Sequence, residues 1–376
     1  MGIRFDRDSR RATNGPLIFF NDPTSEIGLA QEIRGSINSG LSFYCYRQPG
    51  DLMISFGSSE GYLEGIGEPG YAIGFFEPDK PYLTIPYRGC KRTGEHKMFY
   101  DFPNHSTYFE EYKKEIEGIK EALSAGTTDK VVASRVILET AALDLSATFF
   151  ELSRQYPDAY VFSFGTPATG CWIGASPEIL LKSEHGTLST MALAGTREAS
   201  TISDWDPKNI EEQEIVTRYI YNVFNRCGLK PILEATFTKR AGNIEHICTP
   251  IHAEIPENPD IESLLRQLSP TPALCGSPKE QAIRIIKEYE NFDRGCYGGF
   301  SGPYHSVSDF SMHVVLRCAS VMEMAFAVYS GGGIVGSSCV ETEWEETTLK
   351  ADTFLSCVRE EDTKIGTLLE DPDEYY

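Results

Sequence analysis

The sequence lacks paired cysteines, an excess of basic residues and a long apolar run. With 34 Lys and Arg against 55 Asp and Glu, its formal charge of −21 excludes a surface that binds nucleic acid or anionic membranes, since both need a basic field. The ten cysteines are spread singly, without a C-x-x-C pair or a zinc-spaced Cys/His cluster, which predicts free thiols in a reducing compartment. No apolar run of about 18 residues exists, and the start MGIRFDRDSRR lacks the apolar segment of a signal peptide. We therefore expect a cytoplasmic protein without nucleic-acid or membrane partners.

Short apolar stretches fill most of the 376 residues and predict β-strands. Up to about residue 105 they alternate with glycine and proline turns, with one helix near 24–38. The first clear helix begins in HSTYFEEYKKEIEGIKEAL, where we assign Thr107 and Glu110 as a capping-box pair. After it come KVVASRVILE, a short helix near 146–154, and the strands AYVFSFG, GCWIGA, EILLKS and TLSTMALAGT. Strands joined by turns favour antiparallel sheets, because parallel strands need crossover helices.

Three further helices are predicted near 208–226, 261–268 and 279–291. Single strands are predicted in PILEATFTK, EHICTPIHAEI, YGGFSG, MHVVLRCA and MAFAVYS. No linker or internal repeat interrupts the pattern. We therefore expect one α+β domain over 1–376, with large antiparallel sheets and helices packed outside.

The stretch YSGGGIVGSSCVETEWEETTLK combines a glycine run with an acidic helix. The glycines are interpreted as the end of a strand, where their N–H groups are open to an anionic ligand. A helix from about residue 341 would put Glu343, Glu346 and Lys350 on one face, which indicates a hard cation held beside an anion. For such a run taken alone, a solvated acidic helix is the alternative.

The helix from Lys208 repeats this pattern, because it places Asn209 and Glu212 on one face, with Lys208 one turn before Glu212. Glutamates from two helices would form the oxygen-rich site that Mg²⁺ prefers. Arg317 lies in the apolar segment VVLRCAS, which is an expensive place for a guanidinium unless a carboxylate meets it. The other candidate groups for an anionic substrate are Lys130, His246, Arg294, Tyr297 and Lys350.

Several motifs in order resemble the chorismate-utilising enzyme family: KVVASR, GASPEILL, LAGTR, KNIEEQEIV, HICT, PTPALCGSP, RGCYGGFSG, LRCAS and SGGGIVGSSCVETEWEETTLK. They span roughly Tyr108 to Cys357. The resemblance implies two large antiparallel sheets packed centrally with helices on the outer faces, and an active site in the cleft between them. Residues 1–105 would then be a variable, β-rich part of the same unit, and 106–376 the catalytic part.

The resemblance also implies roles for single residues. Glu212 and Glu346 match direct Mg²⁺ ligands, and Glu343 matches a ligand that acts through metal-bound water. Glu178 matches the general acid. The positions that match substrate-binding residues are Thr196, His246, Tyr297, Arg317, Gly331, Gly333 and Lys350. The chain departs from the family at Asn209, Gln213 and Ser269, where acidic residues or histidines are common, so the Asn209 departure is expected to weaken metal binding.

Lys130 separates the activities of the family. Ammonia-using members carry glutamine at this position and water-using members carry lysine, and water must lose a proton to a base as it attacks. We therefore hypothesise that neutral Lys130 activates water for attack at C2 of chorismate, while Glu178, with a raised pKa, protonates the departing C4 hydroxyl. The product would be isochorismate, and no glutaminase partner is expected.

Other functions stay open at this point. A salicylate synthase makes the same intermediate and then eliminates pyruvate, and the motifs do not separate the two. An aminating anthranilate or aminodeoxychorismate synthase subunit is disfavoured by Lys130, and a non-catalytic cation-binding protein would leave Lys130 and Arg317 unexplained. Among pathways, we expect menaquinone supply over siderophore synthesis.

Overall fold

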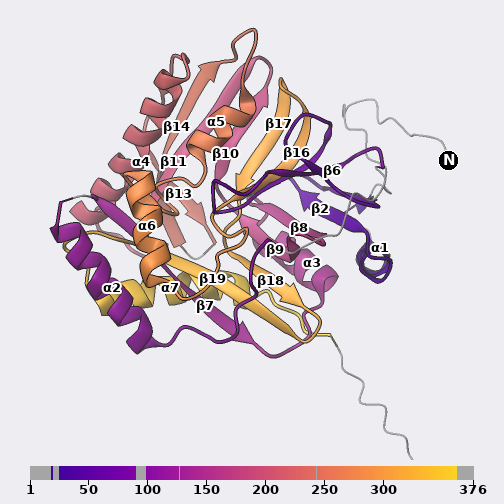
Figure 1. Cartoon of the computed structure of the whole chain (residues 1–376), viewed down its shortest axis with the longest axis horizontal. Helices are drawn as coiled ribbons and strands as arrows, with labels where there is room; N and C mark the ends of the chain where they lie inside the picture. The colour runs from indigo at the N-terminus through magenta and orange to yellow at the C-terminus, as the bar shows by residue number, and fades with distance from the viewer. Residues whose placement is uncertain (1–17, 20–24, 90–98, 127, 243, 362–376) are drawn as a thin grey trace, which may run out of the picture.

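The computed structural model describes residues 18–19, 25–89, 99–126, 128–242 and 244–361. This part of the chain forms two antiparallel sheets and seven helices (Figure 1). The predicted α+β class with large antiparallel sheets is therefore confirmed. Within the described residues, no helix is both long and apolar enough to cross a membrane.

The first sheet has nine strands in the order β1-β3-β2-β8-β9-β18-β19-β7-β15. Their bounds are β1 (Ile18–Phe19), β2 (Ser42–Arg47), β3 (Met53–Ser59), β7 (Lys130–Glu139), β8 (Tyr160–Thr166), β9 (Gly170–Ser176), β15 (Gly276–Ser277), β18 (Cys318–Met322) and β19 (Ala325–Ile334). The glycine run of β19 pairs with β7, with Gly331 opposite Ser134 and Gly333 opposite Val132.

The second sheet has ten strands in the order β12-β14-β11-β10-β17-β16-β5-β6-β4, and β13 also pairs with β14. Their bounds are β4 (Leu63–Glu64), β5 (Gly70–Gly74), β6 (Leu83–Pro86), β10 (Ile179–Glu184), β11 (Thr187–Glu198), β12 (Ile232–Leu233), β13 (Phe237–Ala241), β14 (Ile244–Glu254), β16 (Phe300–Ser306) and β17 (Asp309–Val314).

The helices are α1 (Ser25–Asn38), α2 (Phe109–Ser124), α3 (Leu145–Gln155), α4 (Pro207–Arg226), α5 (Ile261–Leu268), α6 (Lys279–Tyr289) and α7 (Val340–Leu355). Apolar residues of α1, α3 and α7 pack on one face of the nine-stranded sheet. Helix α4 packs against β11 and β14, and helices α2 and α6 pack against β7 (Figure 1). Helices α4 and α7 thereby hold their glutamates beside the strands on which they pack, β11 and β14 for α4 and β19 for α7.

Strand β2 shows how the sequence builds the two faces of its sheet. Phe43 and Cys45 contact the cluster formed with α1 and α3, whereas Tyr44 and Tyr46 belong to the large aromatic cluster shared with the ten-stranded sheet. Successive side chains of a strand point to opposite faces, so a continuous apolar run places a core on both sides. The shared cluster joins the two sheets through buried apolar contact.

The predicted capping box of α2 is wrong by one residue. The helix begins at Phe109, and the pair is Tyr108 and Glu111, whose carboxylate accepts the Tyr108 N–H at 2.9 Å. The Thr107 hydroxyl is taken by another strand, because it accepts the Val136 N–H at 3.1 Å. Because this tertiary hydrogen bond occupies the hydroxyl of Thr107, Thr107 does not cap the helix as the local pattern had predicted.

The segment MHVVLRCA is not one strand. Strand β17 ends at Val314 in one sheet and β18 begins at Cys318 in the other, so the three residues between them cross from sheet to sheet. Arg317 lies in this crossing with φ of 47° and not inside a strand. The single strand predicted in PILEATFTK is likewise two strands, β12 and β13, which pair with different parts of β14.

The glycine run is also placed differently from its interpretation as a strand end. Gly331, Gly332 and Gly333 all lie inside β19 and are paired along β7. The run is therefore regular strand. Its lack of side chains matters for the space that it leaves open.

Candidate active site

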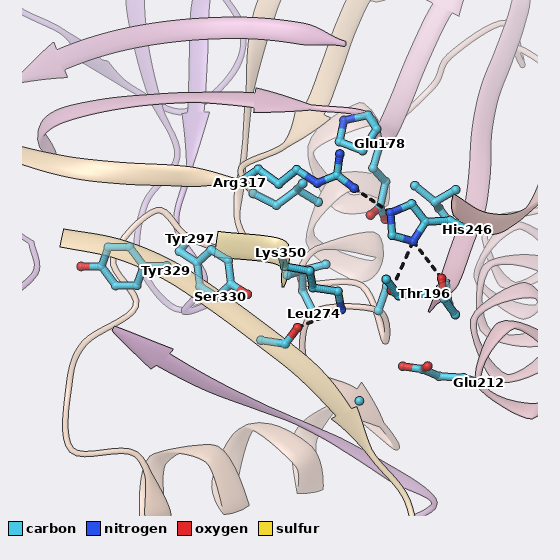
Figure 2. A pocket seen from close by; sticks show the side chains of 18 residues that line it. Glu178, Thr196, Glu212, His246, Leu274, Tyr297, Arg317, Tyr329, Ser330 and Lys350 are labelled. Atoms are coloured by element: carbon cyan, nitrogen blue, oxygen red, sulfur yellow. Dashed lines mark hydrogen bonds between the residues drawn. The ribbon is translucent and has the colours of Figure 1, made fainter. Parts of the chain in front are cut away.

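A cavity of about 660 Å³, counting the space at its mouth, opens where β11 and β14 of one sheet face β19 of the other (Figure 2). Most of the predicted site residues line it, namely Glu178, Thr196, Glu212, His246, Tyr297, Arg317, Gly331, Gly333 and Lys350. Of the remaining three, Lys130 and Glu346 contact the lining residues Glu212 and Lys350, and Glu343 pairs with Lys208. The structure thus gathers the predicted residues in one place, although their roles stay predictions.

Glu178 lies in the short connection between β9 and β10, in the sequence Ser176-Pro177-Glu178. Only 2% of the residue is exposed, and the Ser176 hydroxyl accepts its backbone N–H at 3.2 Å. Burial raises the pKa of Glu178 to about 8, against the opposing charges of Lys239, Lys130 and Arg317. At neutral pH this carboxyl group therefore holds a proton that it can donate.

His246 of β14 joins Arg317 to the backbone of β11. Its Nδ1 lies 2.8 Å from the Gly195 carbonyl, which can only accept, so Nδ1 carries the hydrogen. Its Nε2 accepts from the Arg317 guanidinium at 2.6 Å. Burial and the charge of Arg317 lower the pKa of His246 well below its ordinary value. The imidazole is therefore neutral and holds the guanidinium toward the cavity (Figure 2).

Backbone geometry supports this end of the site at two positions. Gly195 has φ of 72°, next to the irregular register between β11 and β14, and so can turn its carbonyl to His246. Arg317 adopts φ of 47° without being glycine, a conformation that costs about 1–3 kcal/mol and concentrates at functional sites. Burial lowers the pKa of Arg317 to about 10, so the group keeps its charge at neutral pH.

Lys130 and Glu212 form an ion pair at the other end of the site. The Lys130 side chain is fully buried, and its Nζ lies 2.7 Å from Glu212 Oε1. Burial would raise the pKa of Glu212, but the ammonium groups of Lys130 and Lys208 hold it below its ordinary value. Gly333 makes room for the pair, since a Cβ there would lie 2.7 Å from Lys130 Cε and collide with the Glu212 carboxylate.

The acidic helix α7 carries its own paired charges. Glu343 Oε1 lies 2.7 Å from Lys208 Nζ, and Glu346 Oε1 lies 2.7 Å from Lys350 Nζ. Lys350 also donates to the Gly331 carbonyl at 3.0 Å, which ties the helix to the glycine run. Burial raises the pKa of Glu343, and Lys208 opposes the shift. The predicted sharing of one helix face by Glu343, Glu346 and Lys350 is consistent with these contacts.

The carboxylates of Glu212, Glu343 and Glu346 fit a hard cation by their chemistry, because all are oxygen donors and little exposed. The Lys208 ammonium stands in for such a cation, since it contacts Glu343 and lies 3.9 Å from Glu346. Burial would lower the pKa of Lys208, but Glu346 and Glu343 raise it well above its ordinary value. In the described ranges, no three potential ligands stand close enough together to hold a metal ion in this arrangement.

Sequence reasoning missed two lysines that bear on the site. Lys208 was noted only for its spacing from Glu212, and that spacing of one helical turn was the available signal. Lys239 of β13 donates to the Pro177 carbonyl at 2.8 Å, beside Glu178. No local pattern pointed to Lys239, because its partner lies 62 residues away.

The three departures from the family pattern have structural contacts. Asn209 accepts the Thr196 N–H at 2.9 Å and donates to Asp206, so it links α4 to β11. Gln213 donates to Thr249 Oγ1 at 2.6 Å and fixes α4 on β14. The Ser269 carbonyl accepts from the Lys279 ammonium just after α5.

Arg294, one of the cationic candidates, is a structural residue. It donates to the carbonyls of Leu274 and Val132, at 2.7 Å and 2.8 Å, and pairs with the Glu290 carboxylate. Glu290 in turn accepts the Ser134 N–H at 2.9 Å. The buried pair therefore completes the hydrogen bonding along the edge of β7, beside the glycine run.

Comparison with known proteins places this site in a family. The profile of the family described as "Chorismate binding enzyme" matches residues 91–359. The chain is 32% identical over 241 residues to isochorismate synthase EntC of Escherichia coli K12, which covers 61% of this chain and 62% of EntC. It is 29% identical over 262 residues to isochorismate synthase MenF of Bacillus subtilis, covering 66% of this chain and 55% of MenF. Each alignment spans less than two thirds of the relative.

The fold has a solved counterpart. DhbC from Bacillus anthracis, described as a 2,3-dihydroxybenzoate-specific isochorismate synthase, superimposes with a TM-score of 0.71 at 24% identity. The superposition covers 87% of this chain and 99% of DhbC. At this identity the likeness establishes the fold, two antiparallel sheets with outer helices, and leaves the activity to the residues of the site.

Proposed function

This chain belongs to the chorismate binding enzyme family, and on that premise we propose that it converts chorismate to isochorismate. The observation that carries the proposal is Lys130, a fully buried lysine paired with Glu212 in the cavity wall. A lysine here suits a water-activating base, whereas ammonia-using enzymes of the family need none. Two relatives that are named isochorismate synthases support the same activity.

The reaction needs a base at C2 of the ring and an acid at C4. Lys130, once its ammonium group has given up a proton to become the neutral amine, takes a proton from the water that attacks C2, which forms the new C–O bond as the diene shifts. Glu178 gives its proton to the C4 hydroxyl, which leaves as water, so that one water enters and one departs. The raised pKa of Glu178, about 8, supports this role because the group starts protonated at neutral pH.

Chorismate is a dicarboxylate, and the cavity offers cations for it in an otherwise acidic protein. Arg317 and Lys350 line the cavity, and we assign them to the substrate carboxylates together with Tyr297. Gly331 and Gly333 of β19 line the cavity, and we assign their backbone to the substrate carboxylates as well. Thr196 and His246 line the wall nearer the ring, where neutral His246 orients Arg317.

Glu212 and Glu346 would hold Mg²⁺ directly, and Glu343 through a water molecule. When bound, the metal supplies positive charge that neutralises a substrate carboxylate. Without the metal, Lys208 and Lys350 hold the carboxylates of α7 in place through their ion pairs. We place the enzyme in the cytoplasm, in menaquinone supply, with no glutaminase subunit.

Product analysis tests the proposal. The purified protein is incubated with chorismate and Mg²⁺, and the mixture is separated by chromatography. Isochorismate as the product supports the proposal, and unchanged chorismate rejects it. Near wild-type isochorismate formation by Lys130→Gln would remove Lys130 from the mechanism.

Salicylate synthase is the second candidate, since it forms isochorismate and then eliminates pyruvate, and the sequence motifs do not separate the two activities. Its signature in the experiment is salicylate with an equal amount of pyruvate. An ammonia-using synthase is disfavoured by Lys130, and anthranilate or aminodeoxychorismate formed on addition of ammonium would favour it.

A further inference from the structure

A second cavity lies directly behind the wall that carries Glu178. Pro177 and Arg317 line both cavities, and the second has a volume of about 1350 Å³, counting its mouth. Its other lining includes Lys239 and Arg240 of β13. The peptide before Glu178 therefore has open space on two sides. Packing alone fixes such a thin wall poorly, so its position depends on specific contacts.

Lys239 makes such a contact from the side of the second cavity. Its Nζ donates to the Pro177 carbonyl at 2.8 Å and lies 3.6 Å from Met191 Sδ. In the β13–β14 ladder Lys239 is opposite His246. The same pair of strands therefore holds the acid's peptide through Lys239 and the guanidinium through His246. Burial lowers the pKa of Lys239, so the ammonium is kept there at a cost in hydration.

We propose that Lys239 is a positioning residue for Glu178: it fixes the Pro177–Glu178 peptide and places a positive charge beside the acid. This inference rests on the proposed function of the same site. A charge at this place stabilises the carboxylate that remains after the proton has left, and the fixed peptide aims the carboxyl group into the cavity.

The other groups around Glu178 define what Lys239 adds. Lys130 of β7 and Arg317 of the sheet crossing also oppose the effect of burial on its pKa. His313 of β17 is opposite Ile179, and burial lowers its pKa to about 3, so it carries no charge at neutral pH. Of the charges that oppose burial, that of Lys239 lowers the pKa of Glu178 the most.

Lys239→Met tests the proposal through kcat, KM and the pH profile. Loss of the hydrogen bond is expected to lower kcat roughly tenfold with little change in KM. A tenfold fall corresponds to the free energy of about one charged hydrogen bond. Loss of the charge favours protonated Glu178, so the limb on which activity falls with rising pH moves to higher pH. Lys239→Arg, which keeps the charge, is expected to keep the limb in place.

Arg240→Met is the matched control. Arg240 is the next residue of β13, is exposed, and donates to the Gly242 carbonyl at 3.0 Å. Removing its charge is expected to change neither kcat nor the position of the limb. An equal shift in both methionine variants would overturn the proposal, because the effect would then be one of net charge.

A measurement without substrate separates this inference from the proposed function. Infrared difference spectra against Glu178→Gln report the protonated Glu178 carboxyl band as pH is raised. Lys239→Met is expected to keep this band to higher pH than the wild type. If the band moves while chorismate is untouched, Lys239 acts as proposed and the proposed activity fails. If band and limb stay in place in folded Lys239→Met, Lys239 is only structural and the proposal is wrong.

Discussion

Glu178 and Glu212 stand in the wall of one cavity and are almost equally buried, with 2% and 6% of each residue exposed. Their carboxyl groups nevertheless behave in opposite ways. Burial raises the pKa of Glu178 to about 8, whereas Lys130 and Lys208 overcome burial and hold the pKa of Glu212 below its ordinary value. Burial by itself therefore does not decide the charge of a glutamate. The position of its nearest cation does.

The same difference divides the two ends of the cavity. At the Glu212 end, lysines contact each carboxylate at 2.7 Å, so charges are paired and ready for a cation or an anion. At the Glu178 end the acid is protonated and His246 is neutral, so Arg317 carries the full charge among the described residues that line this end. One end suits binding and the other suits proton donation.

The largest effect is expected from Glu178→Gln. The variant keeps size and hydrogen-bonding shape but cannot give a proton, so kcat should fall by about 10²–10⁴. Stability should not fall, because the replaced group is itself uncharged at neutral pH. Steady-state kinetics and urea unfolding check both parts. A variant that lost stability along with activity would show that Glu178 is ionised in the folded protein.

Lys130→Met, unlike Glu178→Gln, is expected to lower stability as well as activity. It leaves the buried Glu212 carboxylate without its partner, which costs about 3–5 kcal/mol of unfolding free energy, and it also removes the base. Urea unfolding measures the loss. The double variant Lys130→Met/Glu212→Gln should recover much of the stability while staying inactive. Failure of the second change to restore stability would break the comparison at the Glu212 end.

The pH dependence of stability sharpens the comparison next. Glu178 has its pKa raised from 4.5 to about 8, so between these values the folded protein binds more protons than the unfolded chain. The contribution of Glu178 to stability is therefore fully favourable below about pH 4.5 and declines as pH rises toward 8. Urea unfolding across this range should show Glu178→Gln gaining on the wild type as pH rises. Parallel curves would contradict the shift.

The two neighbouring glycines of β19 provide a smaller, paired test. A Cβ at Gly333 would be driven into Glu212 and Lys130, whereas one at Gly332 meets Glu343 Oε2 at 3.1 Å on the other face. Gly333→Ala is expected to cost about 1–3 kcal/mol and most of the activity, and Gly332→Ala clearly less. Thermal unfolding and kinetics of the pair check this. Equal effects of the two substitutions would mean that the close contact of Gly333 with Glu212 and Lys130 is not important for the site.

His246→Asn is expected to have the smallest effect. Loss of the 2.6 Å contact leaves Arg317 less well oriented, and one such hydrogen bond is worth about 1–1.5 kcal/mol. KM for chorismate should then rise roughly tenfold with kcat almost unchanged. A large fall in kcat would assign His246 a direct part in the chemistry.

Local sequence patterns predicted the regular elements well. The helix predicted over 208–226 is Pro207–Arg226, and KVVASRVILE is a strand throughout. Both have strong periodicity or a β-branched run, which local preference controls. The glutamates of α4 and α7 were found for the same reason, because spacing along a helix shows which residues share a face.

What the sequence could not show depends on contacts between distant segments. Nothing local in MHVVLRCA marks the place where the chain leaves one sheet for the other, and so Arg317 was expected inside a strand. The pairing of Lys208 with Glu343 spans 135 residues, and that of Lys239 with Pro177 spans 62. The raised pKa of Glu178 was expected from the family resemblance, but its cause, burial that outweighs the charges of Lys239, Lys130 and Arg317, needed the structure.

The division of the site into a base end and an acid end is tested most directly by the source of oxygen in the product. The protein is incubated with chorismate and Mg²⁺ in water enriched in ¹⁸O, and the isochorismate formed is weighed by mass spectrometry. If Lys130 activates water at C2 while Glu178 protonates the leaving C4 hydroxyl, the C2 hydroxyl of isochorismate carries the solvent's ¹⁸O. Isochorismate without the label would mean that the hydroxyl moves within the molecule, and the two ends would not act as described.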